Sequence, residues 1–121
     1  MSGISFELRL SARLFRDGAK CFGPGVAALL EGVDREGSLQ ASAAAMGMAY
    51  SKAWTTLRAC EQALGFPLLE RRTGGRRGGS SRLTPEGRRL LESYRALEAR
   101  LAQIRRELEA EFESSFRKET V

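Results

Sequence analysis

The fold is decided by residues 38–65, SLQASAAAMGMAYSKAWTTLRACEQALG, in which two helical patterns are separated by a glycine. Ser38 is a good N-cap for a short, alanine-rich helix that ends at Gly47. A second helix is predicted over residues 50–64, and Gly65 ends it. Its apolar residues recur on one face, at Ala53, Leu57, Cys60 and Leu64. Two short helices joined by a tight turn containing glycine are typical of a helix-turn-helix.

The other face of the second helix is polar. It carries a tyrosine, short hydroxyl groups and cations, at Tyr50, Ser51, Lys52, Thr55 and Arg58. The second helix of such a motif can lie in the major groove of DNA, where these groups reach phosphates and base edges. Any amphipathic helix has a polar face, so this pattern alone also fits an ordinary solvent-exposed helix. Tyr50 and Trp54 are candidates for contacts with the DNA backbone or thymine methyl groups, although Trp54 also fits simple packing.

A focus of positive charge follows this helix. The chain has 20 basic and 15 acidic side chains, and the excess comes from residues 71–82, which contain no acid. The arginines of this segment are Arg71, Arg72, Arg76, Arg77 and Arg82. Such a cluster attracts a polyanion, although an isolated basic run also fits a solvated loop.

Glycines are interleaved with these arginines. Between Leu68 and Thr84 the sequence predicts a long-tipped β-hairpin, because glycines supply the backbone angles of a turn and keep the main chain slim. Beside a groove-binding helix this hairpin would act as a wing, with arginines on phosphates and with Arg76 or Arg77 reaching a minor groove. A phosphate-binding P-loop is the alternative. That motif requires a lysine at the position of Ser80 and a helix directly after the glycines. The chain has neither, so the hairpin is the better interpretation.

A long helix is predicted from Pro85 onward. Thr84 is a suitable N-cap, Pro85 favours the first helical position, and no helix breaker follows. Apolar residues then alternate in steps of four and three, at Leu90, Tyr94, Leu97, Leu101, Ile104 and Leu108. A helix of about 30 residues is about 45 Å long, which is more than a small domain can cover. We expect its outer half to pair with a second copy of the chain, the alternative being a helix folded back over its own domain.

The amino-terminal region precedes these elements. Phe6, Leu8 and Leu10 alternate with polar residues, which predicts a half-buried edge strand. A turn is expected at residues 16–18, followed by a short helix that Gly37 ends. The predicted architecture is therefore mainly α-helical with a small β-hairpin.

Domain boundaries follow from this pattern. We expect a winged helix-turn-helix over residues 1–84 and a long dimerisation helix with its tail over residues 85–121. The length of 121 residues suits one ordinary domain with such an extension.

Composition narrows the function classes. The chain has no histidine, and Cys21 and Cys60 stand in no metal or redox motif, so we expect no enzyme activity, no cofactor and no metal site. No apolar run approaches the ~20 residues of a membrane span, and the amino terminus lacks the pattern of a signal peptide. We expect a cytoplasmic protein with no membrane partner.

Three blocks of the sequence are distinctive: YSKAW at residues 50–54, LLERRTGG at residues 68–75 with the glycines at 78–79, and LTPEG at residues 83–87. With these blocks, residues 38–94 resemble the amino-terminal DNA-binding domain of the ModE-type molybdate-responsive regulators. The blocks match, in order, the start of that family's recognition helix, its wing and the opening of its linker helix. The helix-turn-helix and the Leu-Thr-x-x-Gly element are shared with the LysR-type regulators, and either family implies DNA binding.

The resemblance implies a winged helix that dimerises through its last helix and places recognition helix and wing on operator DNA. In full-length members a carboxy-terminal pair of small β-barrel domains binds molybdate or tungstate. Those positions have no counterpart in this chain, so we expect it to read DNA without them. Two other hypotheses stay open: an oxyanion sensor or adaptor, and a partner that pairs with a full-length regulator through matching heptads.

We therefore predict a transcriptional regulator that binds double-stranded DNA as a homodimer. Two recognition helices about one DNA turn, ~34 Å, apart would read an imperfect palindrome. The polar residues of the second helix are the candidates for groove contacts, and the arginines of residues 71–82 should act mostly on phosphates.

Overall fold

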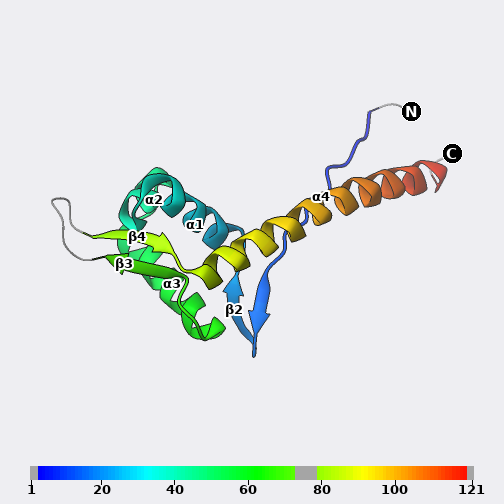
Figure 1. The fold of residues 1–121 in the computed structure, drawn as a ribbon. Helices are drawn as coiled ribbons and strands as arrows, with labels where there is room; N and C mark the ends of the chain where they lie inside the picture. Colours follow the sequence, from blue (N-terminus) through cyan, green and yellow to red (C-terminus); the bar gives the residue numbers. More distant parts are fainter. Residues whose placement is uncertain (1–2, 73–78, 120–121) are drawn as a thin grey trace.

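The computed structural model describes residues 3–72 and 79–119, without the side chain of Glu119. Its elements follow the chain in the order β1 (Leu14–Arg16), β2 (Ala19–Phe22), α1 (Pro24–Glu36), α2 (Leu39–Ala45), α3 (Tyr50–Leu64), β3 (Leu69–Arg72), β4 (Ser80–Leu83) and α4 (Pro85–Glu119). The short helices and two antiparallel hairpins form the domain, and α4 extends away from it (Figure 1). This is the predicted winged helix-turn-helix with a long last helix, to which the β1–β2 hairpin adds an element that the sequence pattern does not predict.

Close packing between α1 and α2 depends on a glycine facing a serine. Ser42 is fully buried, and its Oγ donates a hydrogen bond of 2.7 Å to the carbonyl oxygen of Leu29. A Cβ placed on Gly32 would lie 2.0 Å from that Oγ, which is far inside van der Waals contact. The two helices therefore keep a spacing that a side chain at position 32 would force open.

The ends of α2 and α3 lie where the sequence predicts them. Ser38 Oγ accepts a hydrogen bond of 3.0 Å from the backbone N–H of Ala41, as an N-cap does. Gly37 and Gly65 end α1 and α3 in the left-handed conformation, each with a φ of 87°. The buried face of α3 is the predicted one, formed by Ala53, Leu57, Cys60 and Leu64. The helix-turn-helix prediction is thus confirmed at the level of single residues.

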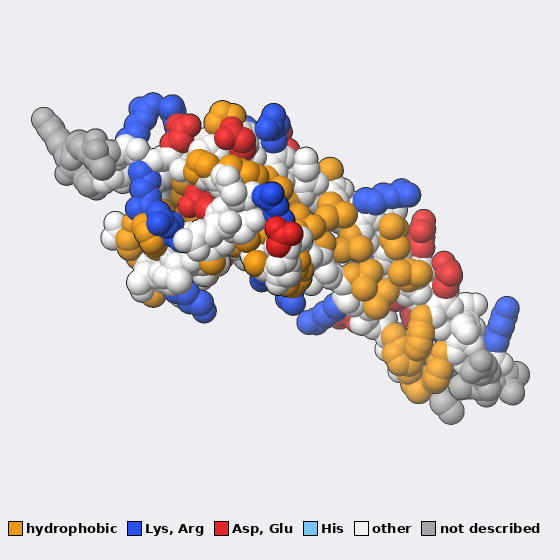
Figure 2. Space-filling view, turned by 90° about the horizontal axis from the view of Figure 1, so that it is seen from below, with side chains coloured by type: hydrophobic (Ala, Val, Ile, Leu, Met, Phe, Trp, Pro, Cys, Tyr) orange, Lys and Arg blue, Asp and Glu red, His pale blue; other side chains and the backbone are white. Residues whose placement is uncertain are grey.

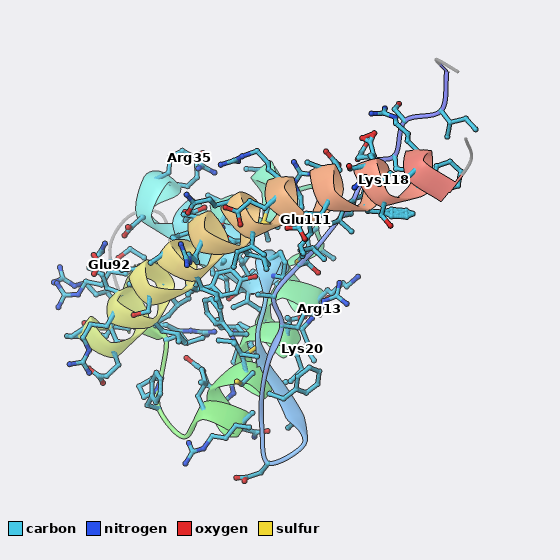
Figure 3. All side chains as sticks on the ribbon, turned by 90° about the vertical axis from the view of Figure 1, so that its right-hand side faces the viewer. Arg13, Lys20, Arg35, Glu92, Glu111 and Lys118 are labelled. Carbon is cyan, nitrogen blue, oxygen red and sulfur yellow. The ribbon has the colours of Figure 1, made fainter. Side chains whose placement is uncertain are left out.

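The predicted edge strand at Phe6, Leu8 and Leu10 is wrong. Residues 3–13, here called the amino-terminal arm, form no strand and run beside the outer half of α4 (Figures 1 and 3). The backbone N–H of Leu8 donates to Glu109 Oε2 at 2.8 Å, and its carbonyl accepts from Arg105 at 3.1 Å. The alternating pattern does mark an extended segment, but the partners of its backbone are side chains of a helix.

The strands lie farther along the chain, in the β1–β2 hairpin. Its turn is formed by Asp17 and Gly18, whose φ values of 52° and 80° are both positive. Asp-Gly favours a two-residue turn of this kind, because both positions need left-handed backbone. The predicted turn is therefore confirmed, and β2 contacts α3 with Cys21 and Phe22 buried.

The first turns of α4 are fixed to the domain. Tyr94 is 1% exposed, and its ring meets Phe22 edge-on with the centroids 5.1 Å apart. Its hydroxyl donates a hydrogen bond of 2.8 Å to the carbonyl oxygen of Ala12. Arg88 donates two hydrogen bonds, of 3.0 and 2.8 Å, to the carboxylate of Asp34 on α1. A packed ring and a bidentate ion pair thus set the direction in which α4 leaves the domain.

Candidate nucleic-acid interface

The exposed face of α3 carries the side chains that the sequence singles out. The members of this face are Tyr50, Ser51, Lys52, Thr55 and Arg58. Because the opposite side of α3 is buried in the core, this polar face is the one available to a partner. Its side chains supply hydroxyl donors and acceptors together with two cations, which are the groups that read base edges and phosphates.

The β3–β4 hairpin lies beside α3 (Figure 1). Its strands pair antiparallel, with Leu69 opposite Leu83 and Arg72 opposite Ser80. Arg71 and Arg72 are exposed near the outer end of β3. The predicted hairpin is therefore confirmed. Two of its candidate residues, Arg76 and Arg77, lie outside the described residues.

Arg82 differs from its neighbours. Its Nε donates a hydrogen bond of 2.8 Å to Glu70 Oε2 on the opposite strand. Both side chains are largely exposed, so this cross-strand pair stabilises the hairpin weakly. A contact of Arg82 with phosphate stays a prediction, and the carboxylate of Glu70 would have to share that arginine with it.

Trp54 connects the helix with the hairpin. The guanidinium carbon of Arg58, one turn along α3, lies 4.7 Å from the centroid of the indole ring. The guanidinium carbon of Arg71, on β3, also lies 4.7 Å from it. The ring is half-buried and packs against the core. The sequence predicts Trp54 as a candidate DNA contact, and the structure uses it as a platform for two cationic side chains.

Hydrogen bonds fix both strands of the hairpin to the domain. Glu61 Oε2 on α3 accepts from the backbone N–H of Leu68 at 2.7 Å and from that of Leu69 at 3.4 Å. The N–H of Ser81 donates to the carbonyl oxygen of Gly37, the residue that ends α1, at 3.0 Å. The hairpin is therefore anchored both to α3 and to the end of α1. Sequence reasoning missed Glu61, because nothing local distinguishes it from a solvent-exposed carboxylate.

Thr84 joins the hairpin to α4. Its Oγ1 donates a hydrogen bond of 2.8 Å to the carbonyl oxygen of Pro67 and accepts one of 2.9 Å from the N–H of Gly87. A Cβ on Gly87 would lie 2.5 Å from the carbonyl oxygen of Leu68, so the close approach requires glycine there. The predicted N-cap is confirmed. The same hydroxyl group also links the chain that enters the hairpin, at Pro67, to the start of α4.

A hollow of about 240 Å³ separates the hairpin from the start of the helix-turn-helix. Its lining residues are Ser38, Leu39, Gln40, Tyr50, Arg71, Arg72, Gly79, Ser80 and Ser81. Two guanidinium groups and several hydroxyl groups facing one hollow suit an anionic group. The sequence pattern does not point to Gln40, Ser80 or Ser81, because they come to line one hollow only when the hairpin is anchored at the end of α1.

The exposure of the predicted dimer seam changes along α4. Tyr94 lies in the core of its own chain and offers no surface to a second one, and Leu90 packs against the same core. Farther out, Leu97 and Leu108 are 40% and 44% exposed. Figure 2 shows apolar side chains gathered over the end of the molecule where α4 and the amino-terminal arm lie. Leu101 and Ile104, like Leu90, are half-buried.

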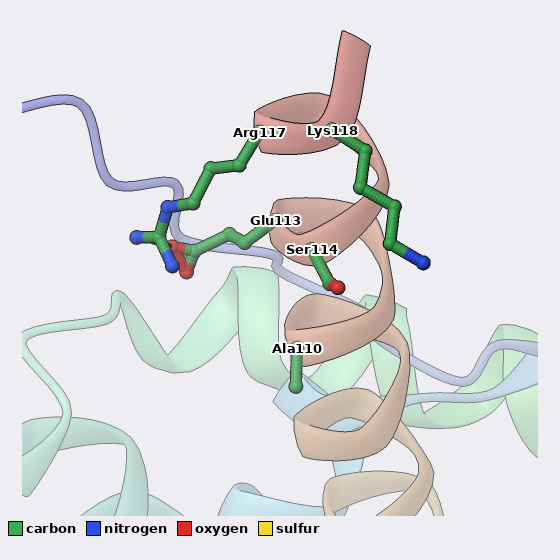
Figure 4. Close-up of a pocket in the computed structure, with 5 residues that line it drawn as sticks. All are labelled: Ala110, Glu113, Ser114, Arg117 and Lys118. Atoms are coloured by element: carbon green, nitrogen blue, oxygen red, sulfur yellow. Dashed lines mark ion pairs between the residues drawn. The ribbon is translucent and has the colours of Figure 1, made fainter. Parts of the chain in front are cut away.

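A second hollow, of about 460 Å³, lies near the end of α4 (Figure 4). It is lined by Ala110, Glu113, Ser114, Arg117 and Lys118, all from one helix. Glu113 and Arg117 form an ion pair of 3.6 Å across one turn. A surface built from a single helix encloses no ligand, so this hollow is not a candidate site.

Groups typical of catalysis or metal binding do not converge in the part of the chain that the structure describes. Residues 3–72 and 79–119 contain no cluster of acidic and cysteine side chains that could hold a metal ion. Cys21 and Cys60 are buried and free. Burial, and then the neighbouring Cys21, raises the pKa of the Cys60 thiol, which keeps it protonated and weakly nucleophilic. Nor does any helix of these residues have the length and apolarity to cross a bilayer.

Known proteins share this sequence pattern. The chain is 37% identical to the molybdenum-pterin-binding protein MopB of Rhodobacter capsulatus over 91 residues, which is 75% of this chain and 33% of MopB. It is 41% identical to the molybdenum transport protein ModE of Azotobacter vinelandii over 70 residues, 58% of this chain and 26% of that protein. It is 34% identical to the DNA-binding transcriptional dual regulator ModE of Escherichia coli over 91 residues, 75% and 32% of the two chains.

The chain spans about a third of the length of these relatives or less. A family match covers the domain itself: residues 27–88, from α1 to the start of α4, fit the family described as bacterial regulatory helix-turn-helix protein, lysR family. That match includes the helix-turn-helix, Trp54 and both strands of the hairpin, and it spans half of the chain. The protein therefore belongs to the lysR family of bacterial regulatory helix-turn-helix proteins, whose helix-turn-helix is a DNA-binding motif.

Proposed function

We propose that the chain regulates transcription by binding double-stranded DNA with the exposed face of α3 and the β3–β4 hairpin. The observation that carries this proposal is the meeting of Arg58 and Arg71 at the ring of Trp54. It makes the helix face and the hairpin one continuous cationic surface. A major groove about 12 Å wide admits α3, and the adjacent backbone then lies within reach of the hairpin.

Each set of side chains has a distinct role in this proposal. Ser51, Lys52, Thr55 and Arg58 contact base edges in the major groove, and Tyr50 contacts the backbone at the start of the helix. The hairpin arginines contact phosphates, with Arg76 or Arg77 extending towards the minor groove. The hollow beside Arg71 and Arg72 would accommodate one backbone phosphate, since its lining combines guanidinium and hydroxyl groups.

We further propose that two copies pair through the outer half of α4 and read an imperfect palindrome. Support comes from the apolar row that continues beyond the domain, where Leu97 and Leu108 are about two-fifths exposed. Leu101 and Ile104 lie between them in the same heptad seam. A row of this length on a charged helix is typical of a helix that meets a second helix.

The DNA proposal is tested by fluorescence anisotropy of labelled duplexes with the purified chain over a series of salt concentrations. Replacing Arg76 and Arg77 with alanine should weaken binding to every duplex alike and lower the salt slope by about 0.9 for each phosphate that is no longer neutralised. The matched control is the removal of Arg100 and Arg106, which carry the same charge on α4. An unchanged salt slope in the hairpin variant would contradict the role of the hairpin.

Base reading is tested separately, at the helix. Replacing Lys52 or Arg58 with alanine should change the preference among duplexes by about 1–3 kcal/mol for each base edge that the side chain reads. Equal weakening on every duplex would assign these side chains to the phosphate backbone instead.

The dimer proposal is tested by light scattering. Leu97→Glu combined with Leu108→Glu places two charges on the seam and should give a monomer, because charges are excluded from such a helix pair. Ala99→Glu combined with Gln103→Glu adds the same charge off the seam and should leave a dimer. A wild-type chain that is monomeric alone, and dimeric only with a longer relative, would favour the heterodimer hypothesis.

The hollow beside Arg71 and Arg72 also favours a second candidate function, an oxyanion sensor. Several relatives are named for molybdenum, so molybdate is the first anion to test. Equilibrium dialysis against molybdate, sulfate and phosphate separates the two functions. Stoichiometric binding of one anion in the absence of DNA would favour the sensor.

A further inference from the structure

We propose that Trp54 is the positioning residue of the DNA interface, holding the guanidinium groups of Arg58 and Arg71 at a fixed separation. This inference rests on the proposed DNA binding and adds a role that residue type alone does not reveal. Arg58 comes from the helix and Arg71 from the hairpin, so one ring relates the two parts of the surface.

The contact geometry leaves both arginines ready for a ligand. A guanidinium is planar, and all five of its N–H groups point outward in that plane. When its face lies over an aromatic ring, the contact uses the face and leaves the N–H edge free. A carboxylate partner uses the edge itself, as Glu70 does with Arg82. The contacts of Arg58 and Arg71 with Trp54 use no hydrogen-bond acceptor, so the N–H groups of both arginines stay available for phosphate or guanine.

The surroundings of the pair support the same role. In residues 3–72 and 79–119, no ion pair joins Arg58 or Arg71 to a carboxylate. Trp54 itself is half-buried and packs against the core, so its ring is a fixed support. Two like charges near one ring repel each other, and the arrangement persists because the ring attracts both. A polyanion bound to both arginines would relieve that repulsion.

Pre-organisation is the physical benefit. A free arginine samples many rotamers, and binding must select one of them at an entropic cost. An arginine already stacked on a ring loses less on binding. Because the ring serves a helix residue and a hairpin residue together, loss of the ring should uncouple base reading from backbone contact.

The test uses variants that keep an apolar side chain but change the ring. Trp54→Phe retains an aromatic face, and Trp54→Leu retains an apolar side chain without one. Phenylalanine should keep duplex affinity within about threefold, whereas leucine should weaken it about tenfold on the preferred duplex. The salt slope should stay unchanged in both variants, because no charge is removed. Circular dichroism confirms that each variant is folded.

A double-mutant cycle separates positioning from a merely structural role. Arg72 is the matched control for Arg71, because it neighbours Arg71 on β3 and carries the same charge but is not stacked on Trp54. Trp54→Leu and Arg71→Lys should be non-additive for duplex affinity, while Trp54→Leu and Arg72→Lys should be additive. Lysine keeps the charge in each case, so the cycle measures orientation.

Trp54 also reports on its own contacts, because it is the one tryptophan of the chain. Arg71→Lys should change the tryptophan emission of the free protein, and Arg72→Lys should not. If the wild-type chain binds duplex, two results would overturn this inference but not the proposed function. They are an unchanged duplex affinity in Trp54→Leu and additive effects of Trp54→Leu and Arg71→Lys. A wild-type chain without salt-dependent duplex binding would overturn the proposed function and this inference with it.

Discussion

Arginines at the two ends of the domain have opposite surroundings. Where α4 meets α1, Arg88 is bound by Asp34 and Arg95 is bound by Glu31. Beside the hairpin, Arg58 and Arg71 lie over the ring of Trp54 instead of a carboxylate. The first set uses its N–H groups to hold two helices together, and the second set keeps them available.

The difference shows which basic side chains of a protein can attract a polyanion. Twenty basic side chains are spread over the chain, but only those without an acidic neighbour create a field that attracts a polyanion. Paired arginines contribute to the stability of the fold, and we propose that the arginines over the ring contribute to recognition. If this division holds, the two ends can be disturbed independently by substitution.

The largest effect is expected at the α4 end of the comparison. Tyr94→Ala removes a fully buried ring and should lower the free energy of unfolding by about 3–5 kcal/mol. Phe112→Ala should cost less than that, about 1 kcal/mol, because Phe112 is 47% exposed and, among the described residues, its ring meets only the rings of Phe6 and Phe116. Urea denaturation followed by circular dichroism measures both. Equal losses of stability would mean that α4 is held along its whole length, not only at its base.

A smaller effect is expected at the junction between the two ends. Thr84→Ala removes the hydroxyl that bonds Pro67 and Gly87, and should lower the free energy of unfolding by about 1–2 kcal/mol, measured by the same urea denaturation. Thr84→Ser keeps the hydroxyl and should restore most of that stability. If serine were as unstable as alanine, the methyl group would be the important part of this residue.

The direct contrast between the ends uses two arginines. Arg88→Ala should lower the free energy of unfolding by about 0.2–1 kcal/mol, less at high salt, and leave duplex affinity unchanged. Arg71→Ala should do the reverse, weakening duplex binding while stability changes by less than about 0.5 kcal/mol. Thermal unfolding and anisotropy on the same samples test this. One variant that affects both properties would remove the distinction between paired and stacked arginines.

The smallest effect is expected at the amino-terminal arm and depends on pH. Hydrogen bonds from Leu8 N–H, and then from Arg105, lower the pKa of Glu109. A depressed pKa means that this contact stabilises the fold above the ordinary carboxyl pKa and is lost as pH falls through the lowered value. Exchange of the Leu8 amide should therefore become less protected in acid. Glu109→Gln should show no such pH dependence, and a matching dependence in that variant would assign the effect elsewhere.

Much of the fold could be predicted from sequence because its signals are local. Ser38, Gly47, Gly65 and Thr84 are capping or terminating residues, and each marks an element end within a few residues of chain. The β3–β4 hairpin was indicated by a run of arginines and glycines without acid. These signals depend on backbone chemistry at one place, so the rest of the structure does not change their meaning.

What could not be predicted depends on contacts between distant segments. The alternation at Phe6, Leu8 and Leu10 specified an extended chain, but only the folded structure supplies α4 as its partner. Tyr94 fits the heptad seam as well as Leu97 does. In the structure, however, Tyr94 is buried in the domain core and Leu97 is exposed. A heptad pattern gives the face of a helix and not the point where the domain ends.

The candidate site was predicted in outline and refined by the fold. The spacing of Trp54 and Arg58 by four residues places them on one helix face, which is a signal that sequence reasoning could have used. Arg71 belongs to a separate element, β3, and no local sequence pattern predicts that its guanidinium group lies over the Trp54 ring. The partner of Arg82 was equally hidden, because Glu70 becomes its neighbour only through strand register.

The anchoring of the β3–β4 hairpin has a consequence for how a DNA-binding domain of this kind could diversify. The direction of the hairpin is set by two acceptors on the domain: Glu61, which binds the backbone just before β3, and the carbonyl of Gly37, which accepts from Ser81 on β4. If the chain binds DNA as proposed, insertions between β3 and β4 would lengthen the span of duplex covered and leave these anchors, and the angle of α3 in the groove, unchanged. Operator length and operator sequence could then evolve on separate parts of the chain.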